Sequence, residues 1–288
     1  MNEAILTTKT TVIVFPFDAF GAGGTGRGAE LLGDTVREIL ADNKQETRPT
    51  RTDAYRGLVK MREVSFGTTK ALGSWRSIGR QMLRQTLKSG ERVLWLGGNH
   101  LSVLPVYEEL GADGSAAGSL VVQFDAHLDV YQLRDINPNP AHGNFLLHSD
   151  ETLPTIVNIG HRDLFLPPKE VSTYFAAAYT ALEVATITDR IRSDIRTRAK
   201  KAKRVWIDID ADVFDPAAVP GVNMSLPFGP DPLTLLSLID ACWAGNVVGI
   251  SISEFDPGRD DRDTGLTLLG WLIEWLLLRW HEGEADEE

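Results

Sequence analysis

The segments VVQFDAHLDV (121–130) and VWIDIDADVFDP (205–216) decide the fold of this 288-residue chain. Each begins with a run of apolar, partly β-branched residues, and each run passes directly into acidic residues. Near-continuous apolar strands are typical of parallel sheets whose two faces are both covered by helices. In such sheets ligands bind just outside the carboxyl ends of the strands. The two segments therefore predict a buried parallel sheet with a polar site at one edge.

Strand and helix patterns alternate along the rest of the chain, which predicts βαβ units. Apolar runs predict strands at 10–16, 92–96, 119–125, 154–159, 204–210 and 247–252. Helical spacing of apolar residues predicts helices near 29–42, 70–89, 101–110, 189–202, 231–244 and 265–281. No long linker or repeat interrupts this order. We expect a single α/β domain over residues 1–288, a doubly wound three-layer α/β/α sandwich around a mostly parallel sheet, with a frayed acidic tail at 281–288.

Composition narrows the class of function. With 29 basic and 40 acidic residues the formal net charge is −11, which argues against a nucleic-acid partner and suits a cationic ligand or metal. The single cysteine, Cys242, excludes a disulfide framework and a CxxC zinc site. The apolar stretch 264–280 contains Glu274 and Arg279 and is read as a buried helix rather than a membrane span. We therefore expect a cytoplasmic protein without a signal peptide and without membrane contact.

Two further segments look functional, but their sequences predict structural roles. GAGGTG (21–26) has the spacing of a dinucleotide fingerprint, but no second strand with an acidic end follows about 20 residues later, so it predicts a turn before the helix at 29. RIRSDIRTRAKKAKR (190–204) alternates basic with small and apolar residues, which is typical of the solvated face of an amphipathic helix.

The chemistry is concentrated where the strands end. Asp125, His127 and Asp129 alternate after the strand at 119–125, and on an extended segment side chains two apart point to the same side. An imidazole between two carboxylates is unsuited to a hydrophobic core and well suited to binding a metal ion. The structural alternative for any one of these residues alone is a helix cap or a satisfied buried polar group.

A second acidic set has the same spacing. Asp208, Asp210 and Asp212 alternate directly after an apolar run, and aligned carboxylates repel one another unless a cation lies among them. Spacing alone leaves open which of the three bind; Asp215, before a proline, is read as a cap. In LGGNH (96–100), His100 follows a third strand and is expected to point into the same crevice.

The donor types indicate the metal and the reaction class. Two histidines with at least four aspartates and no thiolate suit Mn²⁺ better than structural zinc. Carboxylates exceed what one ion needs, and they bridge well, so we expect two ions about 3.5–4 Å apart. Such a pair activates water at neutral pH, which predicts metal-assisted hydrolysis.

Three motifs together resemble the ureohydrolases, the family of arginase, agmatinase and formiminoglutamase. They are GGNHLSVLP (97–105), FDAHLD (124–129) and DADVFDPAAVPG (210–221), the last followed by Gly229. The resemblance implies an α/β/α sandwich around an eight-stranded parallel sheet, a pair of Mn²⁺ ions for which Ni²⁺ or Co²⁺ can substitute, and a homo-oligomer, trimer or hexamer.

The resemblance also implies a ligand set. One ion would be held by His100, Asp125, Asp129 and Asp210, and the other by Asp125, His127, Asp210 and Asp212. Asp208 stands where relatives usually carry Ser or Thr, outside the ligand set, and its role stays open.

By the same resemblance His142 and Glu254 lie on the substrate side. Glu254 would pair with a guanidinium, Asp129 would accept a hydrogen bond from the attacking hydroxide, and His142 would help to protonate the leaving amine. FDP follows at 255–257 where relatives often show a residue and then Asn-Pro. The expected products are urea and an amine.

The loop from Asp129 to His142 should choose the substrate tail. It holds Tyr131 and Pro138 rather than the Asn and Ser donors of arginases, and Arg134 could clamp a carboxylate or lie at the surface. Asp-x-Tyr at 129–131 resembles agmatinases and guanidino-acid hydrolases, so we expect a linear guanidino compound rather than arginine. Formiminoglutamase or arginase activity with the same metal site, a single-zinc deacetylase-like enzyme and a non-catalytic homologue are the alternatives.

Overall fold

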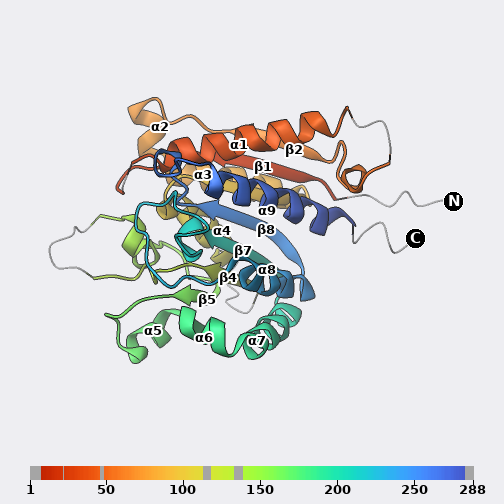
Figure 1. Cartoon of the computed structure of the whole chain (residues 1–288). Coiled ribbons are helices and arrows are strands. Elements are labelled where there is room, and N and C mark those ends of the chain that lie inside the picture. The colour runs from red at the N-terminus through yellow and green to blue at the C-terminus, as the bar shows by residue number, and fades with distance from the viewer. Residues whose placement is uncertain (1–7, 22, 46–48, 113–117, 133–138, 283–288) are drawn as a thin grey trace.

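A computed structural model describes residues 8–21, 23–45, 49–112, 118–132 and 139–282 (Figure 1). In this part of the chain eight strands form one all-parallel sheet in the order β2-β1-β3-β8-β7-β4-β5-β6. The strands are β1 (Thr10–Phe15), β2 (Val59–Glu63), β3 (Arg92–Gly97), β4 (Ser119–Phe124), β5 (Thr155–His161), β6 (Ala177–Thr180), β7 (Arg204–Asp210) and β8 (Val247–Ser253). The six predicted strands are confirmed; the two that sequence reasoning missed, β2 and β6, are the edges of the sheet.

Helices cover both faces of this sheet. They are α1 (Thr25–Asp42), α2 (Thr69–Gly73), α3 (Trp75–Lys88), α4 (Leu104–Gly111), α5 (Pro168–Tyr174), α6 (Ala181–Thr186), α7 (Thr188–Lys201), α8 (Pro232–Ala241) and α9 (Thr264–His281). The predicted start of the first helix at 29 is wrong: α1 begins at Thr25, after Gly24 in the left-handed region (φ 107°). The helix predicted at 70–89 is two helices, because Ser74 (φ −107°) leaves helical geometry. None of the helices in the described ranges is long and apolar enough to span a lipid bilayer.

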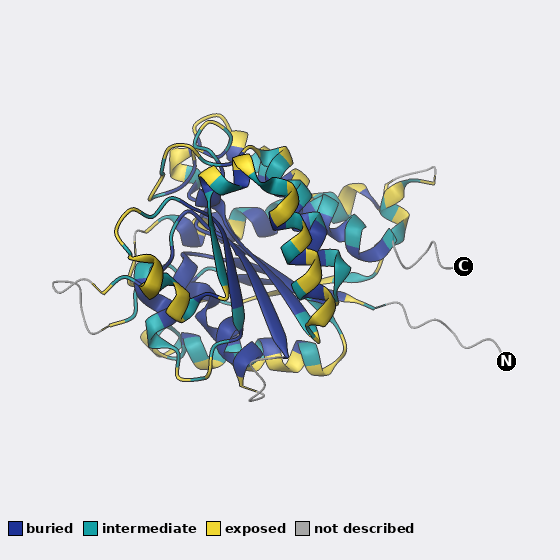
Figure 2. Ribbon diagram, turned by 90° about the horizontal axis from the view of Figure 1, so that it is seen from below, coloured by how far each residue is buried: buried dark blue, intermediate teal, exposed yellow. Residues whose placement is uncertain are grey.

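The core lies in two layers, one on each face of the sheet. Alternate residues of β1 divide between them: Val12 and Val14 belong to the layer that includes residues of α1, α7, α8 and α9, whereas Ile13 and Phe15 belong to the layer that includes residues of α3 and α4. Figure 2 shows the buried strands enclosed by helices whose outer faces are exposed. The three-layer α/β/α sandwich is therefore confirmed, as is the amphipathic reading of α7.

The glycine-rich segment serves packing at this point of the fold. Gly28 lies in the first turn of α1, where a Cβ atom would overlap the carbonyl oxygen of Phe255. Asp18 accepts hydrogen bonds from the backbone N–H groups of Gly24 and Gly26 at 3.2 and 3.1 Å. A protein carboxylate thus occupies the N-terminus of α1 that a dinucleotide phosphate would need.

Candidate metal centre

Four neighbouring strands carry the predicted site residues at their carboxyl ends. The central strands β3, β8, β7 and β4 lie side by side, and they lead to His100, Glu254, Asp210 and Asp125 respectively. Pairing of Phe124 with Ile209 and of Asp210 with Ser253 brings these ends level. The structure therefore brings the two acidic segments, the turn with His100 and the turn with Glu254 into one crevice.

The local backbone differs from the extended segments that the spacing predicts. β4 ends at Phe124, and residues 125–129 turn instead of continuing the strand. Asp212 lies in a 3-10 helix, η4 (Ala211–Val213), that Asp210 caps. Asp129 and Glu254 have left-handed backbones, with φ of 51° and 62°. Such geometry costs about 1–2 kcal/mol at a residue with a side chain, and this strain occurs at the site.

The first group of donors converges on the ring of His100. Its Nδ1 atom lies 2.8 Å from Asp129 Oδ2, 3.2 Å from Asp210 Oδ2 and 3.3 Å from Asp125 Oδ2. One ring nitrogen can donate at most one proton, so it cannot satisfy three carboxylates. Asp125 Oδ2 is buried without a hydrogen-bond partner. An orphaned anionic oxygen among other carboxylates is the environment that a cation would stabilise.

A second group shares Asp125 with the first. His127 Nδ1 lies 2.8 Å from Asp212 Oδ2 and 3.8 Å from Asp125 Oδ1. Possible ligand atoms of His100, Asp125 and Asp129 lie within 4.8 Å of one another, and so do those of Asp125, His127 and Asp212. Two groups that meet at one carboxylate form an arrangement that can hold a pair of cations.

Backbone N–H groups hold the carboxylates in place. Asp125 Oδ1 accepts a hydrogen bond from His127 N at 2.6 Å, and Asp210 Oδ1 accepts one from Asp212 N at 2.9 Å. Asp212 Oδ1 accepts one from Ala126 N at 3.2 Å. One oxygen of each carboxylate is thus fixed, which leaves the other directed at the shared space.

Crowding of acids shifts the protonation equilibria of the cluster. Burial, reinforced by Asp129, raises the pKa of Asp125 to about 7, and burial raises the pKa of Asp210 well above its usual range. Burial opposes the charge of His127, but the partner Asp212 outweighs it and raises the pKa of His127 to about 10. For Asp212 the ion pair with His127 likewise outweighs burial and lowers the pKa. A divalent cation would favour the ionised carboxylates.

Glu254 and His142 stand together beside this cluster. Glu254 Oε1 accepts a hydrogen bond from His100 N at 2.7 Å, and it lies 3.3 Å from His142 Nδ1. The hydrogen bond between His142 and Glu254 raises the pKa of His142 and outweighs the opposite effect of burial. A Cβ atom on Gly21 would overlap the Asn99 side chain and lie 3.5 Å from His142 Cδ2, so Gly21 lies close against this side of the site.

A cavity of about 240 Å³ opens next to these residues. It is lined by His127, Asp129, Tyr131, Ala141, His142, Gly143, Asn144 and Met224. Burial raises the pKa of Tyr131, whose hydroxyl accepts a 3.4 Å hydrogen bond from Leu128 N. Arg134 and Pro138 lie outside the described residues. Met224 is a lining residue that sequence reasoning missed, because no local pattern links it to a loop more than 80 residues earlier.

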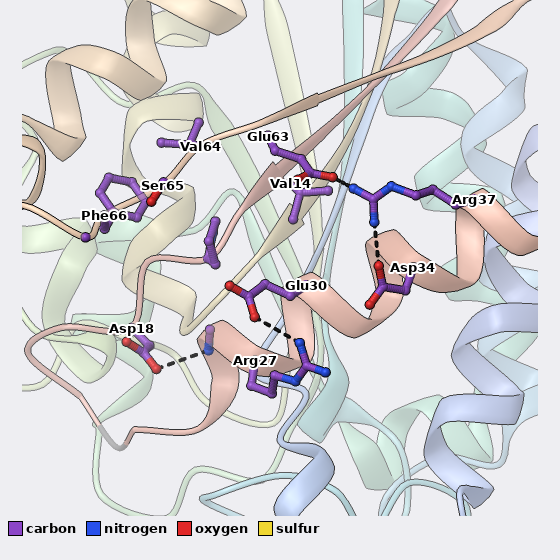
Figure 3. A pocket seen from close by; sticks show the side chains of 13 residues that line it. Val14, Asp18, Arg27, Glu30, Asp34, Arg37, Glu63, Val64, Ser65 and Phe66 are labelled. Atoms are coloured by element: carbon purple, nitrogen blue, oxygen red, sulfur yellow. Dashed lines mark hydrogen bonds and ion pairs between the residues drawn. The ribbon is translucent and has the colours of Figure 1, made fainter.

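A larger hollow, of about 650 Å³, lies elsewhere, beside α1 and β2 (Figure 3). Both of its arginines are already paired with carboxylates. Arg27 meets Glu30, and Arg37 bridges Asp34 and Glu63. This hollow offers exposed charges, whereas the crevice holds buried carboxylates that outnumber their histidine partners, so the crevice is the better candidate for chemistry.

These features define an α/β protein with a carboxylate-rich candidate metal centre at the carboxyl ends of a parallel sheet. The sequence profile of the arginase family matches residues 8–277. The chain therefore belongs to the arginase family, the ureohydrolases, as the motifs indicate.

Particular relatives differ in how much of the chain they match. An agmatinase from Serratia proteamaculans is 29% identical over 202 residues, covering 67% of this chain and 61% of the relative. The chain thus spans less than two thirds of that relative's length. A formimidoylglutamase from Halalkalibacterium halodurans is 28% identical over 284 residues, covering 89% of this chain and 87% of the relative.

Solved structures share the fold at lower identity. A hypothetical agmatinase from Burkholderia thailandensis superposes with a TM-score of 0.78 at 18% identity, covering 97% of this chain and 87% of that one. Arginase from Bacillus subtilis gives a TM-score of 0.74 at 19% identity, covering 94% and 98%. These two likenesses establish the arginase-like fold of the chain.

Proposed function

We propose that this protein is a binuclear-metal hydrolase that cleaves a linear guanidino compound into urea and an amine. The observation that carries the proposal is the pair of His/Asp groups that meet at Asp125 beside Glu254. A buried carboxylate next to a metal pair suits a planar cation held over activated water.

The residues fit two ions as the family resemblance implies. Our assignment gives one ion to His100, Asp125, Asp129 and Asp210 and the other to Asp125, His127, Asp210 and Asp212. Oxygen donors with one imidazole per ion favour Mn²⁺. When bound, two such ions would lower the pKa of water and stabilise the charge that develops at the central carbon.

The chain's own residues would supply orientation and proton transfer. Glu254, fixed by His100 N, would hold the guanidinium nitrogens and aim the carbon at the cluster. Asp129 would accept a hydrogen bond from the attacking water. His142, within 3.3 Å of Glu254, would carry the proton that the leaving amine needs.

The lining of the cavity favours a substrate tail without a carboxylate. Its described residues include no lysine or arginine, and Tyr131, Ala141 and Met224 provide apolar surface. The methylene groups of the aminobutyl tail of agmatine would pack there, and this tail brings no carboxylate that would need a cationic partner. Arg134 could reverse this preference by clamping a carboxylate. A formimino substrate is the second candidate, because the formimidoylglutamase relative matches along most of both chains.

A substrate panel tests the proposal. Mn²⁺-loaded protein would be assayed for urea with agmatine, guanidinobutyrate, guanidinopropionate, arginine and guanidine, and for glutamate with formiminoglutamate, whose other hydrolysis product is formamide. We expect urea from agmatine or a guanidino acid. Arg134→Ala should abolish turnover only of substrates with a carboxylate tail.

Two variants distinguish catalysis by this protein from the activity of a contaminating enzyme. Asp210→Asn should remove activity together with bound metal, whereas Glu254→Gln should retain the metal and lose turnover by about 10²–10³-fold. The surface variant Asp240→Asn is the control, since Asp240 pairs only with Arg279 on the described helices α8 and α9. Two bound ions with no turnover of any compound in the panel would refute the proposed substrates.

Assembly and location complete the proposal. A trimer or hexamer in the cytoplasm is the further expectation of the family resemblance. Light scattering on the purified protein tests the assembly, and a monomer would contradict it.

A further inference from the structure

Asp208 is a buried carboxylate that the assignment of metal ligands leaves without a role. It lies within β7 and is fully buried. It accepts three hydrogen bonds from side chains: from Tyr107 Oη at 2.7 Å, from Ser251 Oγ at 2.5 Å and from His100 Nε2 at 2.9 Å. Ser251 in turn accepts a hydrogen bond from Trp206 Nε1 at 2.9 Å. A polar network this complete inside a core fixes the position of every member.

The position of Asp208 in the strand explains its contact with His100. Residues 208 and 210 are two apart, so they share a face of the sheet and lie about 6.6 Å apart along the strand. The His100 ring bridges them, with Nε2 toward Asp208 and Nδ1 3.2 Å from Asp210 Oδ2. Phe145 packs against the ring, with centroids 4.8 Å apart, and restricts its rotation.

We propose that Asp208 is a positioning residue that prepares His100 to bind metal. A carboxylate accepts hydrogen bonds and does not donate them, so the proton at this contact belongs to His100 Nε2. In the neutral ring Nδ1 then carries the lone pair, and that lone pair faces Asp125, Asp129 and Asp210. The partner of a ligand's second nitrogen sets its tautomer, orientation and basicity.

Tyr107 and Ser251 allow the carboxylate to be buried. Their hydroxyl groups donate to Asp208, which spares it the desolvation penalty of an unpaired buried anion. Tyr107 Oη and His100 Nε2 share Oδ2, whereas Ser251 takes Oδ1. The carboxylate plane is therefore held from both ends. A Ser or Thr at 208, with one shorter and neutral oxygen, could not accept these three hydrogen bonds together.

Metal binding tests this inference, which rests on the proposed metal centre but not on any substrate. Mn²⁺ affinity would be measured by equilibrium dialysis and electron paramagnetic resonance on the whole chain and on Asp208→Asn and Asp208→Ser. We expect the ion at His100 to bind about 10–100-fold more weakly, as for other lost partners of ligating histidines, and the second ion to change by less than about threefold. Asp260→Asn is the matched control, because Asp260 is also buried but caps α9 through Gly265 N and Leu266 N.

A spectroscopic readout separates positioning from general destabilisation. In protein labelled with ¹⁵N-histidine and loaded with Zn²⁺, we expect a His100 Nε2–H signal, assigned by its loss in His100→Asn, that Asp208→Ser weakens or shifts. Tyr107→Phe and Ser251→Ala each remove one donor and should lower Mn²⁺ affinity by about two- to fivefold, which keeps the test valid if the Asp208 variants do not fold. Mn²⁺ affinities within twofold of the unmodified protein, or a His100 signal that Asp208→Ser leaves unchanged, would overturn the inference. Absence of turnover in the unmodified protein with both ions bound would count against the proposed substrates and would leave this inference standing.

Discussion

Replacing Gly28 by alanine should destabilise the protein, although alanine is the better helix former. In the interior of a helix, Gly→Ala ordinarily stabilises by about 1 kcal/mol. Here the new Cβ atom would overlap both atoms of the Phe255 carbonyl group, and Phe255 Cδ1 is at 3.3 Å. A backbone carbonyl cannot rotate away as a side chain can, so either α1 or the segment around Phe255 must move.

Both ends of that segment are tethered. Glu254 N donates to Gly98 O at 2.8 Å, and Asp256 N donates to Gly221 O at 2.7 Å. Overpacking of a core costs about 1–3 kcal/mol, which exceeds the helix-propensity gain. We expect a net loss of about 1–2 kcal/mol, measured as a lower urea midpoint and a melting temperature lower by about 2–4 °C per kcal/mol.

The activity should fall further than the stability. Movement of Phe255 displaces its neighbour Glu254, which is proposed to orient the substrate. A small misplacement of such a group can lower kcat/KM by about 10²-fold. Gly73→Ala is the matched control, because no atom lies within 4 Å of its Cβ position at the end of α2. It should be neutral or stabilise by up to about 1 kcal/mol. If Gly28→Ala proves as stable and as active as Gly73→Ala, the packing argument is refuted.

Three further predictions concern buried side chains that can ionise. Cys242 is buried and burial raises its pKa, so a thiol reagent should label it only after unfolding; rapid labelling of the native protein would contradict the core position. Arg76→Ala leaves the fully buried Glu108 without its bidentate partner and should lose about 3 kcal/mol in urea unfolding, against less than about 1 kcal/mol for the exposed Arg27→Ala. Burial lowers the pKa of His161 below its unfolded value of about 6.5, so the contribution of neutral His161 to stability is lost as pH falls through 6.5. The free energy of unfolding of His161→Gln should therefore decline less between pH 7 and 5 than that of the unmodified protein. Parallel curves of unfolding free energy against pH would disprove this.

The sequence predicts the central strands well and the edges poorly, for a physical reason. Central strands are buried on both faces, so β7 is a continuous buried run apart from its first residue. Edge strand β2 reads VKMRE and is mostly exposed, and β6 has four residues of intermediate burial. Edge strands carry charged and short segments that discourage further pairing, and these lack the pattern that marks a strand. The number of strands could therefore come only from the family resemblance.

The site shows a similar division. Histidine and aspartate at strand ends can be found from sequence because the carboxyl ends of parallel strands meet. The turn after Phe124 could not, since alternation in sequence looks the same whether or not the strand continues. Tyr107 and Ser251 were also out of reach: each lies 40 or more residues from Asp208 in sequence, and only the packing of α4 and β8 on β7 brings them together.

The proposed metal centre depends on the register between β7 and β8, and Gly249 helps to set that register. β7 and β8 pair with an irregularity between Val205 and Trp206, after which Trp206 lies opposite Gly249. A Cβ atom on Gly249 would overlap the indole ring, so the ring fits only where β8 has no side chain. This match fixes the next pairs along the strands, and with them the level at which Glu254 leaves the sheet.

The register between β7 and β8 determines the partners of both Asp208 and Asp210. With Trp206 opposite Gly249, Asp208 pairs with Ser251 and Asp210 pairs with Ser253. A slip by one residue would turn the side chains of one strand to the opposite face of the sheet. Asp208 would then lose its Ser251 donor, and the carboxylates around His100 would no longer share one crevice. The fit of the Trp206 indole against Gly249 thus connects the packing of the core to the alignment of the proposed metal ligands.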